Sequence, residues 1–144
     1  WTWTRFLLIE GITSLTQFSP EINQFIEVLE SYEYLLHAET QAIAAKEIDL
    51  IDSLNEKKDI CIAKLKLLND RFTSNPRSEP IVDSLVEKIF DLQKRNFSAF
   101  SLLVEDQRIK RNKQGATSDF SPNAQKIAQA YKKEYPSRLK NLWE

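Results

Sequence analysis

The chain has 144 residues, which fits one domain with a single apolar core, and its formal net charge is −1. No apolar stretch reaches the roughly eighteen residues of a membrane-spanning helix, and the run Phe6–Ile9 is too short for a secretion signal. The single cysteine, Cys61, has no internal disulfide partner, which indicates a reducing compartment. We therefore expect a protein of a reducing compartment without membrane insertion.

The first predicted region is an N-terminal extension, residues 1–18, of uncertain structure. It is rich in apolar residues without a clear period, so a short helix over 5–16 and a frayed strand are both open. The sequence Ser19-Pro20-Glu21 then gives a helix start, with Ser as N-cap, Pro at the first helical position and an acid in the first turn. This signal predicts a helix from about 20 to 46.

Two apolar stripes of helical period follow. The first comprises Ile22, Phe25, Ile26, Leu29, Tyr32, Leu36 and Ile43, and the second comprises Ile51, Leu54, Cys61, Leu65, Leu68 and Phe72. No Gly or Pro separates them, so one continuous helix of about 80 Å and two helices joined by a turn near 46–49 are both open. We favour the turn, because a lone helix of that length would need an oligomer to cover its stripe. The second helix then spans 48–73.

A loop with two prolines over 73–80 precedes a third predicted helix, 80–113. Basic residues collect near its end, at Arg108, Lys110, Arg111 and Lys113. Cations are favoured at helix C-termini by the helix dipole, and the chain as a whole is slightly acidic. We therefore interpret this cluster as a helix terminus and predict no nucleic-acid partner.

Residues 115–144 are predicted to form a loop, a short amphipathic helix over 122–134 and a tail, and residues 19–114 the helical body. The predicted fold is all-α: an antiparallel bundle of three long helices with coiled-coil-like packing plus a short C-terminal helix. Its expected core consists of Phe25, Leu29, Leu36, Ile51, Leu54, Leu65, Leu68, Leu85, Ile89 and Leu92.

Two polar residues occupy positions of these apolar seams. Asn96 lies on the seam of the third helix, where one polar residue can fix the register of packed helices. Lys58 fills the one missing position of the second stripe, where we expect its ammonium to reach water along its apolar stem.

Residues suited to catalysis are scarce. His37 is the only histidine, four residues after Glu33, which is not the Glu-x-x-His spacing of a di-iron bundle. Cys61 lies on the apolar seam and is interpreted as a small core residue, and no Gly-rich phosphate loop occurs. We expect no enzymatic activity, no cofactor and no bound metal.

The first two helices carry a polarised pattern: Leu35-Leu36-x2-Glu39, then Ala45-Lys46-Glu47-Ile48, Ile51, Leu54 and Lys58, extended by Leu65, Leu68 and Arg71. This pattern resembles the signature of the FlgN-type flagellar export chaperones over roughly residues 20–135. The chain departs from the family in the third helix, where an Asn-Gly step is missing and Asn96 is followed by Ala99-Phe100. The family's tyrosine near the end is echoed by Tyr131 or Tyr135.

The resemblance implies a cytoplasmic chaperone of the flagellar type III export system, which holds hook-associated proteins in a secretable form through its C-terminal region. The residues expected to contact the terminal helix of such a client are Phe97, Phe100, Val104, Ile127, Ala128 and Tyr131. Coverage of these two apolar surfaces by each other within one chain is equally open. A self-associating structural coiled-coil protein, and hence a homo-oligomer, is the alternative function.

Overall fold

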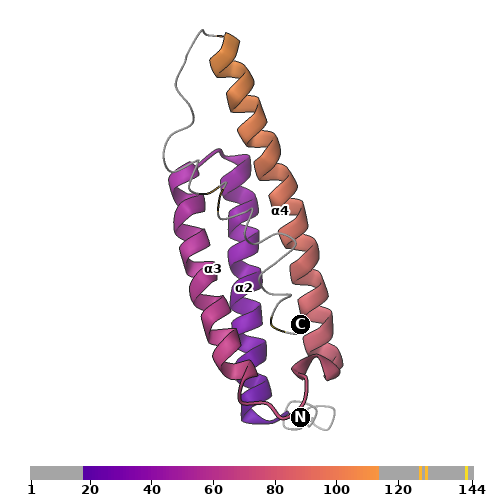
Figure 1. The fold of residues 1–144 in the computed structure, drawn as a ribbon. Coiled ribbons are helices and arrows are strands. Elements are labelled where there is room, and N and C mark those ends of the chain that lie inside the picture. Colours follow the sequence, from indigo (N-terminus) through magenta and orange to yellow (C-terminus); the bar gives the residue numbers. More distant parts are fainter. Residues whose placement is uncertain (1–17, 114–126, 128, 130–141, 143–144) are drawn as a thin grey trace, which may run out of the picture.

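The computed structural model describes residues 18–113, together with Ile127, Gln129 and Leu142. The described elements are the α-helices α2 (Pro20–Ala44), α3 (Ile48–Asn69) and α4 (Pro80–Lys113), with the short 3-10 helix η2 (Pro76–Ser78) between α3 and α4 (Figure 1). This part of the chain contains no strand, so the all-α prediction is confirmed. The predicted helix over 5–16 lies outside the described residues, as does most of the predicted helix over 122–134.

Helix α2 begins where its capping signal predicts. The Ile22 N–H donates to Ser19 Oγ at 3.2 Å, which satisfies one of the backbone donors that a helix leaves free at its first turn. Pro20 occupies the first turn, where its missing N–H costs nothing.

The turn predicted near 46–49 is confirmed, although neither glycine nor proline makes it. Lys46 adopts a left-handed φ of 59° directly after α2. Its N–H donates to the Ile43 carbonyl at 3.0 Å, and the Glu47 N–H donates to the Ala42 carbonyl at 2.9 Å. These two bonds form the helix-ending pattern in which glycine usually takes the left-handed position. They hold Lys46 in a conformation that costs a residue with a Cβ about 1–2 kcal/mol.

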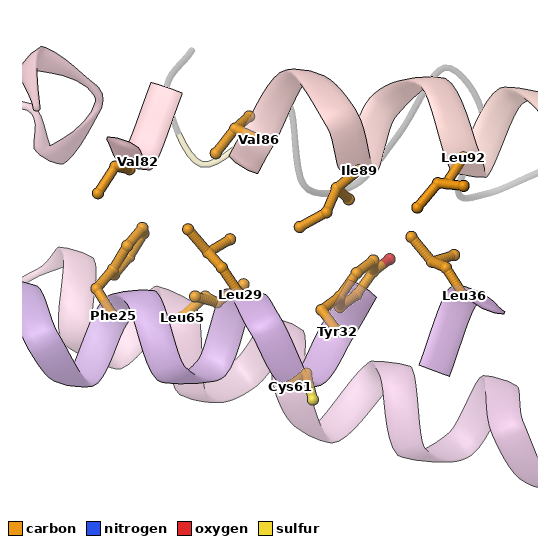
Figure 2. Packing of buried hydrophobic residues seen from close by; sticks show 10 residues of the cluster. All are labelled: Phe25, Leu29, Tyr32, Leu36, Cys61, Leu65, Val82, Val86, Ile89 and Leu92. Atoms are coloured by element: carbon orange, nitrogen blue, oxygen red, sulfur yellow. The ribbon is translucent and has the colours of Figure 1, made fainter. Parts of the chain in front are cut away.

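Helix α2 lies between α3 and α4 and packs against both (Figure 1). One face of α2 meets Val82, Val86, Ile89 and Leu92 of α4, while Cys61 and Leu65 of α3 complete the cluster (Figure 2). Eight of the ten residues predicted for the core are buried. Leu68 and Leu85 are only partly buried against it, and Val86 takes the buried position next to Leu85 because α4 is rotated slightly from the assumed seam.

A second buried cluster surrounds the turn between α2 and α3. It joins Ala42, Ile43, Ile51 and Leu54 to Phe100, Leu103 and Ile127. Beyond it α4 continues past the turn (Figure 1). With 34 residues against 25 in α2, α4 is about 13 Å longer at the usual helical rise. A contact of 3.9 Å between Lys46 Nζ and Asp106 Oδ2 marks the level at which α2 ends.

Among the described helices, none is long and apolar enough to cross a membrane.

Candidate functional site

The residues predicted to contact a client gather around the second apolar cluster. Phe100 and Ile127 are buried there, with 2% and 0% of their surfaces exposed, and Phe97 and Val104 are partly buried against the same cluster. The structure thus brings four of the six residues together within one chain. Ala128 and Tyr131 lie outside the described residues.

A buried ion pair crosses from α2 to α3 next to this cluster. Lys58 Nζ lies 2.9 Å from Glu39 Oε2, and the two side chains are 1% and 0% exposed. The expectation that the Lys58 ammonium reaches water is therefore wrong. An unpaired charge at this depth would be costly, and the carboxylate of Glu39 supplies a partner closer than the solvent.

Asn96 of α4 extends the pair to the third helix. Its Nδ2 donates to Glu39 Oε1 at 2.8 Å and to the Leu36 carbonyl at 2.9 Å, and its Oδ1 accepts from the Thr40 hydroxyl at 2.7 Å. Exchanging the amide oxygen and nitrogen would face oxygen against the oxygens of Glu39 and Leu36, so this orientation is the one that pairs donors with acceptors. Polar groups of α2, α3 and α4 are thereby joined in one buried contact, as expected for a residue that fixes register.

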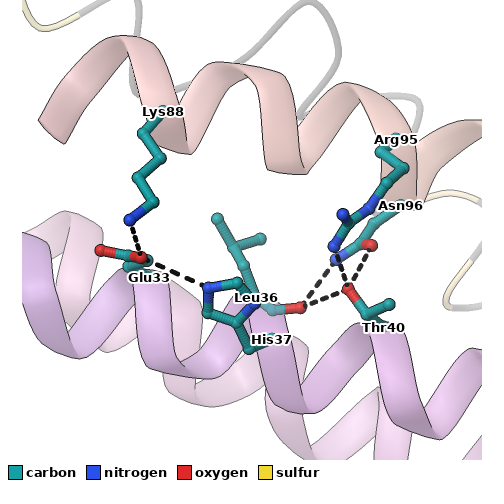
Figure 3. A network of polar contacts seen from close by, with 7 residues as sticks. All are labelled: Glu33, Leu36, His37, Thr40, Lys88, Arg95 and Asn96. Carbon is teal, nitrogen blue, oxygen red and sulfur yellow. Dashed lines mark hydrogen bonds and ion pairs between the residues drawn. The ribbon is translucent and has the colours of Figure 1, made fainter. Parts of the chain in front are cut away.

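A second polar contact lies at the surface between α2 and α4, with Glu33 at its centre (Figure 3). Glu33 Oε2 lies 2.9 Å from Lys88 Nζ and 3.3 Å from His37 Nε2. The hydrogen bond from Lys88 lowers the pKa of Glu33, partial burial opposes that shift, and His37 adds to it. Lys88 and His37 are more than half exposed, so this contact is open to solvent.

Asn55 is a buried polar residue of a different kind. It is 6% exposed, and neither its Nδ2 nor its Oδ1 has a hydrogen-bond partner among the residues that the structure describes. An unsatisfied buried amide costs about 1–3 kcal/mol. Such a group lowers stability at a defined point of α3, one turn from the ion pair at Lys58.

Two hollows with mostly apolar surfaces lie along the line where α2 and α3 meet. The first has a volume of about 290 Å³ and is lined by Ser31, Tyr34, Leu35, Lys57, Ile60 and Cys61. The second has a volume of about 330 Å³ and is lined by Gln24, Glu27, Val28, Lys64, Leu67 and Leu68, with Arg71 at its edge. We call these residues the α2–α3 groove. Each hollow lies at the lower limit of small-molecule sites, which are about 300–1,000 Å³.

The groove offers little chemistry of its own. Burial raises the pKa of the Cys61 thiol, and nearby Lys64 partly opposes that shift, so the thiol is a poor nucleophile. Within the part of the chain that the structure describes, no group of three or more His, Cys, Asp or Glu residues could hold a metal ion. The groove is suited to contacts with apolar side chains.

No protein-family model, curated protein or solved structure matches this chain.

The sequence singled out Lys58 and Asn96 individually but not their contact through Glu39. The available signal was a polar residue on the apolar face of each helix, Glu39, Lys58 and Asn96, but which of these residues meet depends on how the helices are paired. The α2–α3 groove gave a weaker signal, because Ile60 and Leu67 fall just beside the seam of α3.

Proposed function

We propose that this protein is a non-enzymatic chaperone of the flagellar type III export system that works in the cytoplasm. It binds the terminal helix of a hook-associated protein through apolar helical surfaces, and the binding free energy comes from apolar burial. No nucleotide or metal takes part in this binding.

The observation that carries the proposal is the buried contact among Glu39, Lys58 and Asn96. Glu39 and Lys58 are two of the five charged residues of the pattern that resembles the FlgN-type chaperones, and unlike the exposed Lys46, Glu47 and Arg71 they are paired with each other in the interior. A chance heptad match would leave such charges on the surface, because solvated faces of coiled coils carry most charged residues. Their burial as a pair supports the proposal that the fold requires these two charged residues and that the resemblance is not a chance heptad match.

The proposed architecture is an antiparallel bundle of α2, α3 and α4 with coiled-coil-like packing, completed by a short C-terminal helix. The three-residue connection between α2 and α3 supports this arrangement, since connections that short join antiparallel neighbours. The two hollows of the groove also pair later residues of α2 with earlier residues of α3.

In this proposal the client helix contacts α4 at Phe97, Phe100 and Val104, together with the segment that carries Ile127. Phe100 and Ile127 are buried in the same cluster, so a client reaches Phe100 only by displacing Ile127 from that cluster. The exchange replaces apolar contacts within the chain by equivalent contacts with the client, which keeps its net cost low.

Co-purification of the full chain with a flagellar hook-associated protein, followed by calorimetric titration of the pair, tests the proposal. The variant Phe97→Ser changes a half-buried residue of the surface, and Ser98→Ala is its exposed neighbour and control. We expect Phe97→Ser to weaken client binding about tenfold or more, equivalent to about 1.4 kcal/mol, and Ser98→Ala to leave it unchanged. Absence of binding to any hook-associated protein by the unmodified chain would overturn the export role.

The alternative function, a self-associating structural protein, is favoured by one observation on α4. Leu102 and Ile109 are 72% and 41% exposed and are seven residues apart, so they share a face. Sedimentation of the purified chain over a wide concentration range distinguishes the two functions. A mass that rises with concentration, and falls back in Leu102→Ser, favours self-association.

A further inference from the structure

The α2–α3 groove repeats along its length with a period of seven residues. The residues that line the second hollow lie seven positions earlier on α2 than those of the first, and seven positions later on α3. Leu35 is thus replaced by Val28, and Ile60 by Leu67. Because seven residues of α-helix rise about 10.5 Å, the groove presents two hollows of similar volume at the spacing of one heptad.

Apolar side chains at the rim of the groove are open to solvent. Ile60 is 56% exposed and Leu67 is 66% exposed on the α3 side, and Tyr34 is 73% exposed on the α2 side. Ile60 and Leu67 are seven residues apart and therefore lie on one line along α3. A line of this kind beside two hollows matches the surface that a coiled-coil partner helix covers.

A row of cations follows the same line. Lys57, Lys64 and Arg71 border the hollows at successive intervals of seven residues. None of the three forms an ion pair with any residue that the structure describes. Three like charges along one edge repel each other, and carboxylates at heptad spacing on a partner would remove that repulsion.

We propose that the α2–α3 groove docks one amphipathic helix of a partner protein, with apolar side chains seven residues apart in the two hollows and carboxylates seven residues apart against Lys57, Lys64 and Arg71. Two heptads of partner helix, about 21 Å long, span both hollows. This docking site is separate from the α4 surface, and it does not depend on the export role.

Charge argues against two other occupants. Two copies of this chain that met groove to groove about a two-fold axis perpendicular to the helices would bring their cationic rows together, with Lys64 near its own counterpart. A flat anionic membrane would meet an acid as well as cations, because exposed Glu27 lines the second hollow beside Lys64. A single acidic helix can place apolar side chains in the two hollows and carboxylates against the row of Lys57, Lys64 and Arg71.

The test uses a synthetic, fluorescent helix about three heptads long, since shorter isolated helices are marginal in water. Leucines occupy its apolar heptad positions, and glutamates flank them in one version and lysines in the other. Fluorescence anisotropy measures the binding of each version to the full chain. Circular dichroism of every variant checks that the exposed substitutions leave the helices intact.

Three protein variants are compared with wild type. Ile60→Ser with Leu67→Ser removes the apolar rim, and Lys57→Glu with Lys64→Glu and Arg71→Glu reverses the charged row. The control combines Lys66→Glu on the far side of α3 with Leu102→Ser on α4. Leu102 is chosen because its side chain is about as exposed as that of Leu67.

The glutamate probe is expected to bind wild type and the control equally, and the apolar variant about tenfold or more weakly. The charge-reversed variant is expected to prefer the lysine probe. Equal binding of both probes to wild type, or no effect of the groove variants, would overturn the proposal. So would self-association that the apolar variant abolishes, or retention on anionic vesicles without probe binding, because each would identify a different occupant.

Discussion

Two ion pairs on α2, six residues apart, show how depth changes the role of the same chemistry. Glu39 pairs with Lys58 in the interior, where both side chains are at most 1% exposed. Glu33 pairs with Lys88 at the surface, where the lysine is 59% exposed. The distances between nitrogen and oxygen are equal at 2.9 Å, so geometry alone does not separate the two contacts.

The difference lies in what each partner faces when the other is removed. Without Lys58, the Glu39 carboxylate remains enclosed by helices, although Asn96 still donates to it. Without Glu33, Lys88 simply points into water. The buried pair therefore makes the relative placement of α2 and α3 costly to change, whereas the exposed pair adds a small amount of attraction.

The largest expected effect is the loss of one member of the buried pair. Lys58→Met keeps the apolar stem but removes the ammonium, and it should lower the free energy of unfolding by about 3–5 kcal/mol because Glu39 loses its charge partner. Urea denaturation followed by circular dichroism measures this loss. Lys66→Met, an exposed position of α3, is the control, and an equal effect of both variants would show that the buried pair has no special role.

Replacing the whole pair should restore most of that stability. In the double variant Glu39→Leu with Lys58→Met no charge is left enclosed, and Asn96 keeps the Leu36 carbonyl as an acceptor. We expect the double variant to be at least about 2 kcal/mol more stable than Lys58→Met alone, since buried pairs replaced by apolar residues are often neutral. If the double variant is less stable than Lys58→Met alone, Glu39 stabilises the fold through contacts other than its pairing with Lys58.

Asn55 extends the comparison to a buried polar group without a described partner. Asn55→Leu removes the unsatisfied amide at similar volume and should raise the free energy of unfolding by about 1–2 kcal/mol. The urea midpoint of this variant is compared with that of Asn23→Leu, an exposed change on α2 expected to have almost no effect. A loss of stability in Asn55→Leu would indicate that the amide is hydrogen-bonded in solution.

The smallest effect is expected at the exposed pair. The pKa of Glu33 is lowered in the folded state, chiefly by Lys88, so its contribution is present above the unfolded pKa near 4.5 and is lost as pH falls through the lower folded value. Glu33→Gln should cost at most about 1 kcal/mol at neutral pH. Denaturation at pH 7 and in strong acid checks this, with Glu30→Gln as the control. A cost that persists in strong acid would refute the electrostatic origin.

The candidate sites were predictable only in part. Phe100 and Ile127 were predicted to lie on two apolar surfaces that either face a client helix or cover each other, and the structure buries both in one cluster within the chain. The α2–α3 groove was not predicted at all. Its repeat with a period of seven residues becomes visible only when residues of α2 are aligned with those of α3, because neither helix alone contains both walls.

The sequence by itself determined the helices and their ends: the capping serine at Ser19, the prolines at 76 and 80 and the apolar period predict α2, α3 and α4 to within a few residues. Such signals are local, since a cap or a stripe involves neighbours within one or two turns. Only the tertiary structure decided whether the Lys58 ammonium is buried or reaches water, because its position on the seam is compatible with both. That outcome depends on whether a carboxylate of another helix lies within hydrogen-bond distance, and only the packing of α2 against α3 brings Glu39 there.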